Sequence, residues 1–595
     1  MKLKYIAMSA TLGLVSLSSC SDFLDKNPDT RVDPNTPKQL LELMVDGYSS
    51  TSYACVGELS SDNVMDNNSP SDAGVRYNRP SYAAADDQLY KWEAVTMGQD
   101  NDTPTGTWEG CYGAIAVCNA VLEKVAQMEE TGTSYNGPLT ADEKAQLSAV
   151  KGEALVSRAW HYFILVNTFC MPYGGPEKSK GIQGVPYVTK PETTVNPQYE
   201  RGNLADNYDM IEKDLMEGLP LIVDAKEAPK YHFNKASANA FAARFYLYKR
   251  EYEKVVEYAT AAFKGNDPNT MLQDLWSNSS FYYISDIGRY ATSIQRPNVW
   301  MCFTTYTTFW RRFVSSGRYA CTRAAKRATI QGPGPSWESC KYSNSRTKET
   351  FSMMPCFNGY CGTAGGQEYG TYFAGTSFEQ FEYTDKIAGI GYCHGIRAEF
   401  TTEQTLLDRA EAYFYLGKKD LAMADLQVWN EEHRKNTSGD DRMTELTEDQ
   451  IVKFYTKCLN KYVANVDRTD LKEKYSDSIW FGIAKPIRID EVCPSTKYQL
   501  TEDLVPYLQC VQHFRRIEQV HTGQRWFEIK RLGLEVIHKF GKDDTFVLRY
   551  ADDEMRYAIE VPYSAISAGL EPNRKPKNTA MSASIEAKGA YVKVN

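Results

Sequence analysis

Two segments of the chain repeat apolar residues at the three- and four-residue intervals of an amphipathic helix, and each is broken by a short polar turn. In residues 234–263 the break falls at "YKREY". The face before it carries Ala240, Ala243, Tyr246 and Leu247, and the face after it carries Val255, Val256, Ala259 and Phe263. Small alanines let two helices approach closely, so this pattern predicts an antiparallel helical hairpin.

A second segment, residues 405–433, has the same organisation. Ala410, Tyr413, Leu416 and Gly417 precede its turn, and Leu421, Ala424 and Leu426 follow it. Both segments resemble tetratricopeptide units, which place alanines, a tyrosine and Leu-Gly before the turn. Weaker helical patterns occupy residues 107–125 and 151–175, and the latter ends at Pro172 and Gly174, where a helix should stop.

The predicted hairpins are separated by an irregular insertion that runs from residue 265 to about residue 397. The sequence therefore predicts a helical-hairpin part at 20–264 and a loop-rich part at 265–595, with a further hairpin near 401–434. Long loops mounted on a rigid helical scaffold often carry the function, so the insertion is the first place to search for a site.

The start of the chain has the pattern of an export signal. Lys2 and Lys4 precede an apolar run from Tyr5 to Leu17, which is too short to span a bilayer. Leu17-Ser18-Ser19-Cys20 resembles a bacterial lipobox, after which Cys20 would carry lipid. We therefore predict a signal peptide at 1–19 and a lipid attached at Cys20. An ordinary signal peptide with a nearby cysteine is the alternative.

Composition favours a folded, water-soluble body behind this anchor. The 595 residues are 42% hydrophobic and 24% charged, which is ordinary globular usage. A net charge of -9 argues against a nucleic-acid partner, which would require a concentrated basic surface. Among the 14 cysteines, Cys356 and Cys361 are spaced for a small looped disulfide or lie close by chance.

Several motifs follow one another along nearly the whole chain. They are "CSDFLDKNPDT", "ELSSDN", the Trp108, Tyr112, Ile115 and Asn119 series, "EALVSRAWHYFILVNTFCMPYGG", "FNKASANAFAARFYLY", "GQRWFEIKRLG" and "RYAIEVPYSAISAGLEPN". In this order and spacing they resemble the SusD/RagB outer-membrane lipoproteins of Bacteroidota. Two features depart from the family pattern: Glu528 stands where the family usually has aspartate, and the central region is rich in cysteine, arginine and lysine. Both departures bear on the identity of the ligand.

The resemblance implies a mostly α-helical protein with about four tetratricopeptide-like units and minor β structure. Such proteins capture oligosaccharides and act as the lid of a SusC-like TonB-dependent transporter in the outer membrane. The same resemblance implies an anchor in the outer membrane with the body facing the cell exterior, no enzymatic activity and no cofactor. The alternative is a lid or adaptor that binds peptides or proteins through the helical-hairpin surfaces.

A sugar receptor needs flat aromatic plates for C–H faces and a few polar groups for hydroxyls. Helical or strand patterns predict that Trp108, Trp160, Trp300 and Trp429 are buried in the core, and the family resemblance implies the same for Trp526. The aromatic residues outside those patterns are Trp92, which precedes the first hairpin, and Tyr306, Trp310 and Trp337 in the insertion. With Asp62 of "ELSSDN" as a hydroxyl acceptor, these five residues form the predicted ligand-binding set; a turn or cap is the structural alternative for Asp62.

Catalytic signatures are missing from the sequence. It has no G-x-S-x-G, H-E-x-x-H or Walker motif, and the glycines of "GIGYCHG" at 389–395 do not fit a dinucleotide fingerprint. The seven histidines lack the spacing of metal ligands, so no metal site is expected. The 76 acidic residues leave a glycosidase carboxylate pair open. The basic run at 310–327 fits either a solvated loop or a contact with an acidic glycan.

Overall fold

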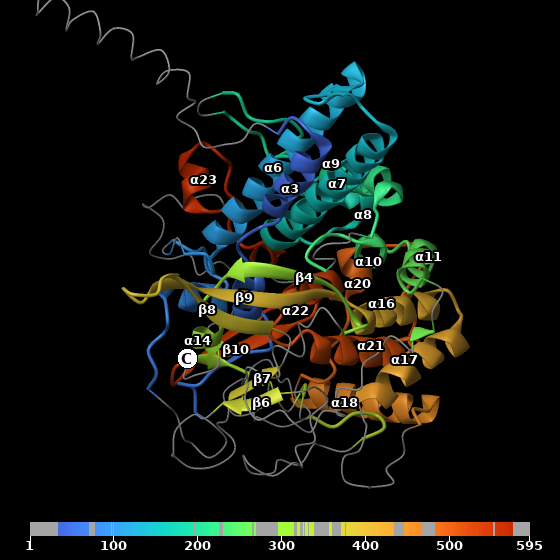
Figure 1. The fold of residues 1–595 in the computed structure, drawn as a ribbon. Coiled ribbons are helices and arrows are strands. Elements are labelled where there is room, and N and C mark those ends of the chain that lie inside the picture. The colour runs from blue at the N-terminus through green and yellow to red at the C-terminus, as the bar shows by residue number, and fades with distance from the viewer. Residues whose placement is uncertain are drawn as a thin grey trace, which may run out of the picture.

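A computed structural model describes residues 34–574 with internal gaps, the largest of which are 269–295, 338–355 and 466–481. The fold is mostly α-helical, as predicted, with small antiparallel sheets (Figure 1). The predicted lipid site at Cys20 lies outside the described residues, as do Cys361 and the side chain of Cys356.

The N-terminal helices are dominated by one long antiparallel pair, α6 (Pro104–Thr131) and α7 (Ala141–Phe169), in the upper part of Figure 1. Helix α6 ends at Gly132, whose φ of +68° suits glycine. Helix α7 begins with a capping box between Thr140 and Glu143. Around them lie α3 (Pro37–Leu43), η1 (Met44–Gly47), α4 (Ala54–Ser60), α5 (Ala84–Tyr90), α8 (Gly175–Ser179), α9 (Leu204–Gly218) and η2 (Leu219–Leu221).

Both strongly patterned hairpins are confirmed. The first consists of α10 (Lys235–Lys249) and α11 (Tyr252–Ala262), and the second consists of α16 (Thr402–Tyr415) and α17 (Lys419–His433). The turns use left-handed residues, Arg250 with φ +60° and Gly417 with φ +68°. Helix α11 contacts α16, so the two hairpins stack although they are far apart in sequence.

The remaining helices continue this stack toward the C-terminus. Helix α21 (Val505–Glu518) packs against α16 and also against α18 (Glu448–Asn465), and α22 (Gln524–Leu532) packs against α4. The short elements are α14 (Phe309–Phe313), α20 (Ile489–Val492), η4 (Glu554–Tyr557) and α23 (Tyr563–Ser567). Because α4 comes from the N-terminal part, its contact with α22 joins that part to the C-terminal helices.

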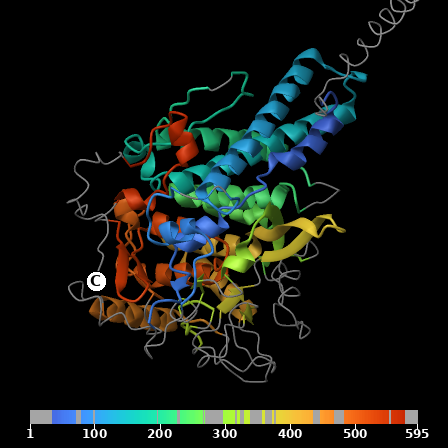
Figure 2. The same cartoon turned by 90° about the vertical axis from the view of Figure 1, so that its left-hand side faces the viewer.

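The insertion contains more regular structure than predicted. Strands β4 (Val299–Tyr306), β9 (Ile390–Thr401) and β8 (Ser377–Asp385) form an antiparallel sheet in that order. The β8–β9 hairpin runs out from the helical body at the left of Figure 1 and stands at its right-hand edge in Figure 2. The expectation of an irregular segment up to residue 397 was therefore wrong for these strands.

Four two-stranded ribbons complete the β structure of the described residues. They pair β1 (Met65–Asp66) with β5 (Tyr319–Ala320), β2 (Thr133–Ser134) with β3 (Gly137–Pro138), β6 (Cys356–Gly359) with β7 (Thr371–Ala374), and β10 (Val536–Phe540) with β11 (Asp544–Leu548).

The core is aromatic where the sheet meets the helices. Trp160 of α7 lies 5.1 Å from Phe241 of α10 and 4.9 Å from Phe400 of β9, as measured between ring centroids. Burial of Trp160, Trp300, Trp429 and Trp526 is confirmed, and the strand predicted around Trp300 is β4. Trp108 is partly buried against Phe169.

A close approach between α4 and α22 yields a stability prediction. A Cβ on Gly57 would overlap the carbonyl of Gly523, so Gly57→Ala should lower the free energy of unfolding by about 1–3 kcal/mol. Gly113 of α6 is an exposed helical glycine with open space around its Cα, so Gly113→Ala should instead raise it by about 0.5–1 kcal/mol. Urea denaturation of both variants measures these two changes in the free energy of unfolding. A neutral or stabilising effect of Gly57→Ala would contradict the close approach.

Candidate functional site

Three aromatic rings meet on one face of the three-stranded sheet, near its outer end. Tyr306, the last residue of β4, pairs directly with His394 of β9, and their rings stack at 5.2 Å with an interplanar angle of 23°. Tyr392 lies two residues before His394, hence on the same face, and its ring is 5.7 Å from that of Tyr306 at 68°. Tyr306 is 37% exposed and Tyr392 is 58% exposed. We call Tyr306, Tyr392 and His394 the aromatic face.

The hairpin that carries this face is built by local sequence chemistry. Strand β8 ends at Asp385, whose Oδ1 accepts hydrogen bonds from the amides of Ile387 (2.8 Å) and Ala388 (2.9 Å). Gly389 then adopts φ +67° and returns the chain into β9. The two strands therefore leave a tight turn in fixed register, which places Glu382 opposite Tyr392 and Gln380 opposite His394.

Polar groups border the aromatic face. The Oε2 of Glu382 lies 3.5 Å from Nδ1 of His394, and its side chain is 57% exposed. Burial lowers the pKa of His394 below its ordinary value, so the ring is neutral at neutral pH. The rings present flat apolar surface, while the carboxylate and the Tyr hydroxyls offer hydrogen-bonding groups, a combination that matches a sugar.

The opposite face of the hairpin is also aromatic. Phe381 and Tyr383 pack edge to face at 4.9 Å, and both are exposed. Toward the body this face leads to a hollow with an empty volume of about 320 Å³. Its lining includes Thr305, Thr307, Glu379, Arg397 and His521.

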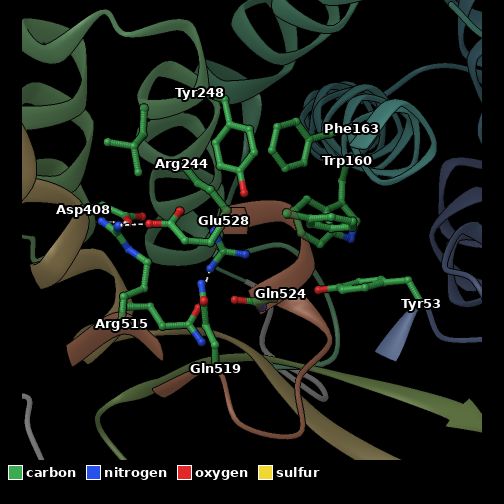
Figure 3. Close-up of a pocket in the computed structure, with 13 residues that line it drawn as sticks. Tyr53, Trp160, Phe163, Arg244, Tyr248, Asp408, Arg515, Gln519, Gln524 and Glu528 are labelled. Atoms are coloured by element: carbon green, nitrogen blue, oxygen red, sulfur yellow. Dashed lines mark hydrogen bonds and ion pairs between the residues drawn. The ribbon is translucent and has the colours of Figure 1, made fainter. Parts of the chain in front are cut away.

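A second hollow lies inside the molecule and is shown in Figure 3. Every side chain that lines it is buried, and its arginines have acidic partners: Arg515 contacts Glu528 at 2.6 Å, and Arg244 lies 3.6 Å from Glu399. Arg531 also donates to Glu528, at 2.9 Å. The family departure at Glu528 is thus part of an interior ion cluster. Its lining side chains are buried and bind one another, so this hollow offers no exposed ring on which a sugar could stack.

Three predicted ligand-binding residues come from the insertion. Tyr306 ends β4, where the sequence placed it after the strand. Trp310 lies in α14, and its side chain is outside the described part of the structure. Trp337 is partly buried, donates its indole N–H to the Gly332 carbonyl at 2.9 Å and stacks on His513 at 6.2 Å.

Asp62 and Trp92 lie in the interior. Both oxygens of Asp62 contact cations: Lys485 Nζ is 2.6 Å from Oδ2 and Arg525 Nε is 2.9 Å from Oδ1. Burial alone would raise the pKa of Asp62, but Arg516, Arg525 and Lys485 hold it well below the ordinary value. Trp92 donates to the Ser60 carbonyl at 2.9 Å and stacks on His538 at 4.5 Å. Neither side chain is offered to a ligand here.

Among the predicted residues whose side chains the structure describes, Tyr306 lies on the aromatic face, and Asp62, Trp92 and Trp337 do not join it there. Sequence reasoning missed Tyr392, His394, Glu382, Phe381 and Tyr383. The available signal was the alternation in "FEYTD" and "IGYCH" on either side of a Lys-Ile-Ala-Gly turn, which is the pattern of a hairpin.

Within the described residues, no group of three or more His, Cys, Asp or Glu side chains is arranged to hold a metal ion. Of the helices in the described part, none combines the length and apolar character needed to cross a membrane.

Comparison with known proteins shows which proteins share this fold. Residues 22–247 match the SusD-like family model described as "Starch-binding associating with outer membrane". A SusD superfamily protein from Bacteroides vulgatus superposes with a TM-score of 0.53 at 16% identity, covering 91% of this chain and all of that one. One from Bacteroides thetaiotaomicron gives 0.50 at 15% identity with the same coverage. No curated protein matches. Residues 22–247 are therefore similar to the SusD-like family, and the chain shares the fold of these SusD superfamily proteins.

Proposed function

We propose that this protein is a non-enzymatic glycan-binding lipoprotein of the outer membrane surface. It would capture oligosaccharides and act as the lid of a SusC-like TonB-dependent transporter, with Cys20 carrying the lipid anchor. The description of the matching family, starch-binding in association with the outer membrane, supports the ligand class and the location.

The single observation that carries the ligand assignment is the exposed aromatic face. A sugar ring stacks its C–H bonds on flat aromatic surface, and a binding face must keep that surface free of the core. Tyr306 and Tyr392 do so, while Trp160, Trp300, Trp429 and Trp526 are buried. Glu382 and the two Tyr hydroxyls surround the stacking surface with groups that can bind sugar hydroxyls.

The test uses residues 21–595, which lack the predicted signal and anchor. We would titrate this protein calorimetrically against plant, microbial and host glycans, and then analyse each mixture for cleaved products. The proposal predicts binding of at least one glycan without cleavage. Cleavage would contradict the non-enzymatic role, and no binding by any glycan would favour the alternative of a peptide or protein ligand.

Association with a transporter needs a separate experiment. Affinity purification of the anchored chain from outer membranes of its own cells should recover a large TonB-dependent β-barrel in stoichiometric amount. Recovery of the anchored protein alone, under conditions that keep other outer-membrane complexes intact, would contradict the lid role.

A further inference from the structure

Negative charge exceeds positive charge around the aromatic face. Glu382 lies directly across the β8–β9 pair from Tyr392 and 3.5 Å from His394, so its carboxylate is held beside two of the three rings. The side chain is 57% exposed, and among the described residues its ion-pair contact is to a histidine. Because His394 is neutral at neutral pH, it does not cancel this negative charge.

The hairpin offers little positive charge to balance Glu382. Between Ser377 and Thr401 the sequence has two strong cations, Lys386 and Arg397. Lys386 stands at the tip, next to Asp385, and Arg397 is buried with its guanidinium 2.5 Å from Glu399. An anionic group on a ligand would therefore meet the carboxylate of Glu382 without a hairpin cation beside the rings.

The basic run at 310–327 could have supplied such cations. Two of its arginines already form ion pairs with aspartates. Arg312 is buried and forms ion pairs with Asp86 and with Asp100, the latter at 3.1 Å. Arg318 contacts Asp66 at 2.9 Å and Asp87 at 3.4 Å. These guanidinium groups hold the interior together, so neither is free to bind an acidic glycan.

We infer that the aromatic face selects neutral glycans and disfavours sulfated or carboxylated ones, with Glu382 as the specificity-determining residue. This inference rests on the proposed function. The carboxylate accepts hydrogen bonds from sugar hydroxyls, and the same charge repels an anionic substituent at hydrogen-bond range. Like charges at about 4 Å across partly solvated surface correspond to roughly a ten-fold change in affinity at low salt.

The experiment compares neutral polysaccharides with charged derivatives of the same backbone. The probes are dextran and dextran sulfate, β-1,3-glucan and its carboxymethyl ether, and xylan and its carboxymethyl ether, each tested at low ionic strength. We expect the neutral member of the bound pair to bind roughly ten-fold more tightly than its charged partner. Glu382→Gln should reduce the ratio of the two affinities, and Glu382→Lys should make the charged member bind more tightly than the neutral one.

Glu502→Lys is the matched control, because it makes the same charge change at an exposed position on another part of the chain. It should leave the ratio unchanged. Equal or tighter binding of the charged member by the native protein, or an unchanged ratio in Glu382→Lys, would overturn this inference while the proposed function stands. Failure of these probes and of the whole glycan panel to bind would overturn the proposed function and this inference with it.

Discussion

Replacing Asp62 with Asn should destabilise the folded protein by about 3–5 kcal/mol, because removing one partner of a buried ion pair leaves uncompensated charge in the interior. The carboxylate contacts Lys485, Arg516 and Arg525, at distances between 2.6 and 3.4 Å. Each of these cations is buried. An amide of the same shape keeps the space filled but supplies no negative charge for the three.

The cluster also connects distant parts of the chain. Asp62 follows α4, Arg516 belongs to α21 and Arg525 to α22. The Asp62 carbonyl accepts a further hydrogen bond from Arg516 at 2.6 Å. Loss of the carboxylate should therefore loosen the contact between the N-terminal segment and the C-terminal helices as well as cost electrostatic energy.

Denaturant unfolding of Asp62→Asn measures this effect, with Asp449→Asn as the control. Asp449 forms an exposed ion pair with Lys453 at 2.7 Å, a kind of pair whose removal typically costs about 1 kcal/mol or less. If Asp62→Asn unfolded like the native protein yet lost glycan binding, Asp62 would return to the ligand-binding role predicted from the sequence.

The second large effect concerns the aromatic face. The double variant Tyr306→Ala, Tyr392→Ala should bind the recognised glycan at least roughly ten-fold more weakly, since each stacked ring contributes about 1 kcal/mol. Both rings are exposed, so the fold should survive their removal. Tyr392→Phe should retain most of the affinity if stacking dominates, because it removes the hydroxyl and keeps the ring.

Calorimetric titration of these variants needs a control tyrosine. Tyr135 is 84% exposed and lies in the turn between α6 and α7, far along the chain from the hairpin. Tyr135→Ala should bind as the native protein does. Equal affinity of the double variant and the native protein would remove the aromatic face from the binding site.

The helical part of the fold could be predicted because its determinants are local. Alanines mark the helix crossing within each hairpin, Ala240 and Ala243 in the first and Ala410 in the second, and Gly417 marks the turn of the second. The same periodicity assigned Trp160 and Trp429 to the core. For such residues the three- and four-residue spacing alone predicts which face of the helix is buried.

The site was harder to predict, because its determinants are contacts between distant residues. The sequence around Asp62 is typical of a turn, yet its ion-pair partners are the distant residues Lys485, Arg516 and Arg525. Trp92 likewise finds its stacking partner in His538. The alternation in "IGYCH" could have placed Tyr392 on a strand. The glycines around it instead suggest a comparison with a dinucleotide fingerprint, which they do not fit.

The most direct test of the central claim is a crystal structure of the protein with the tightest-binding glycan from the panel. We predict a sugar ring stacked on Tyr306 or Tyr392, with a ring hydroxyl within hydrogen-bond distance of Glu382. Glycan bound elsewhere, with Tyr306, Tyr392 and His394 bare, would contradict the assignment of the site to this hairpin.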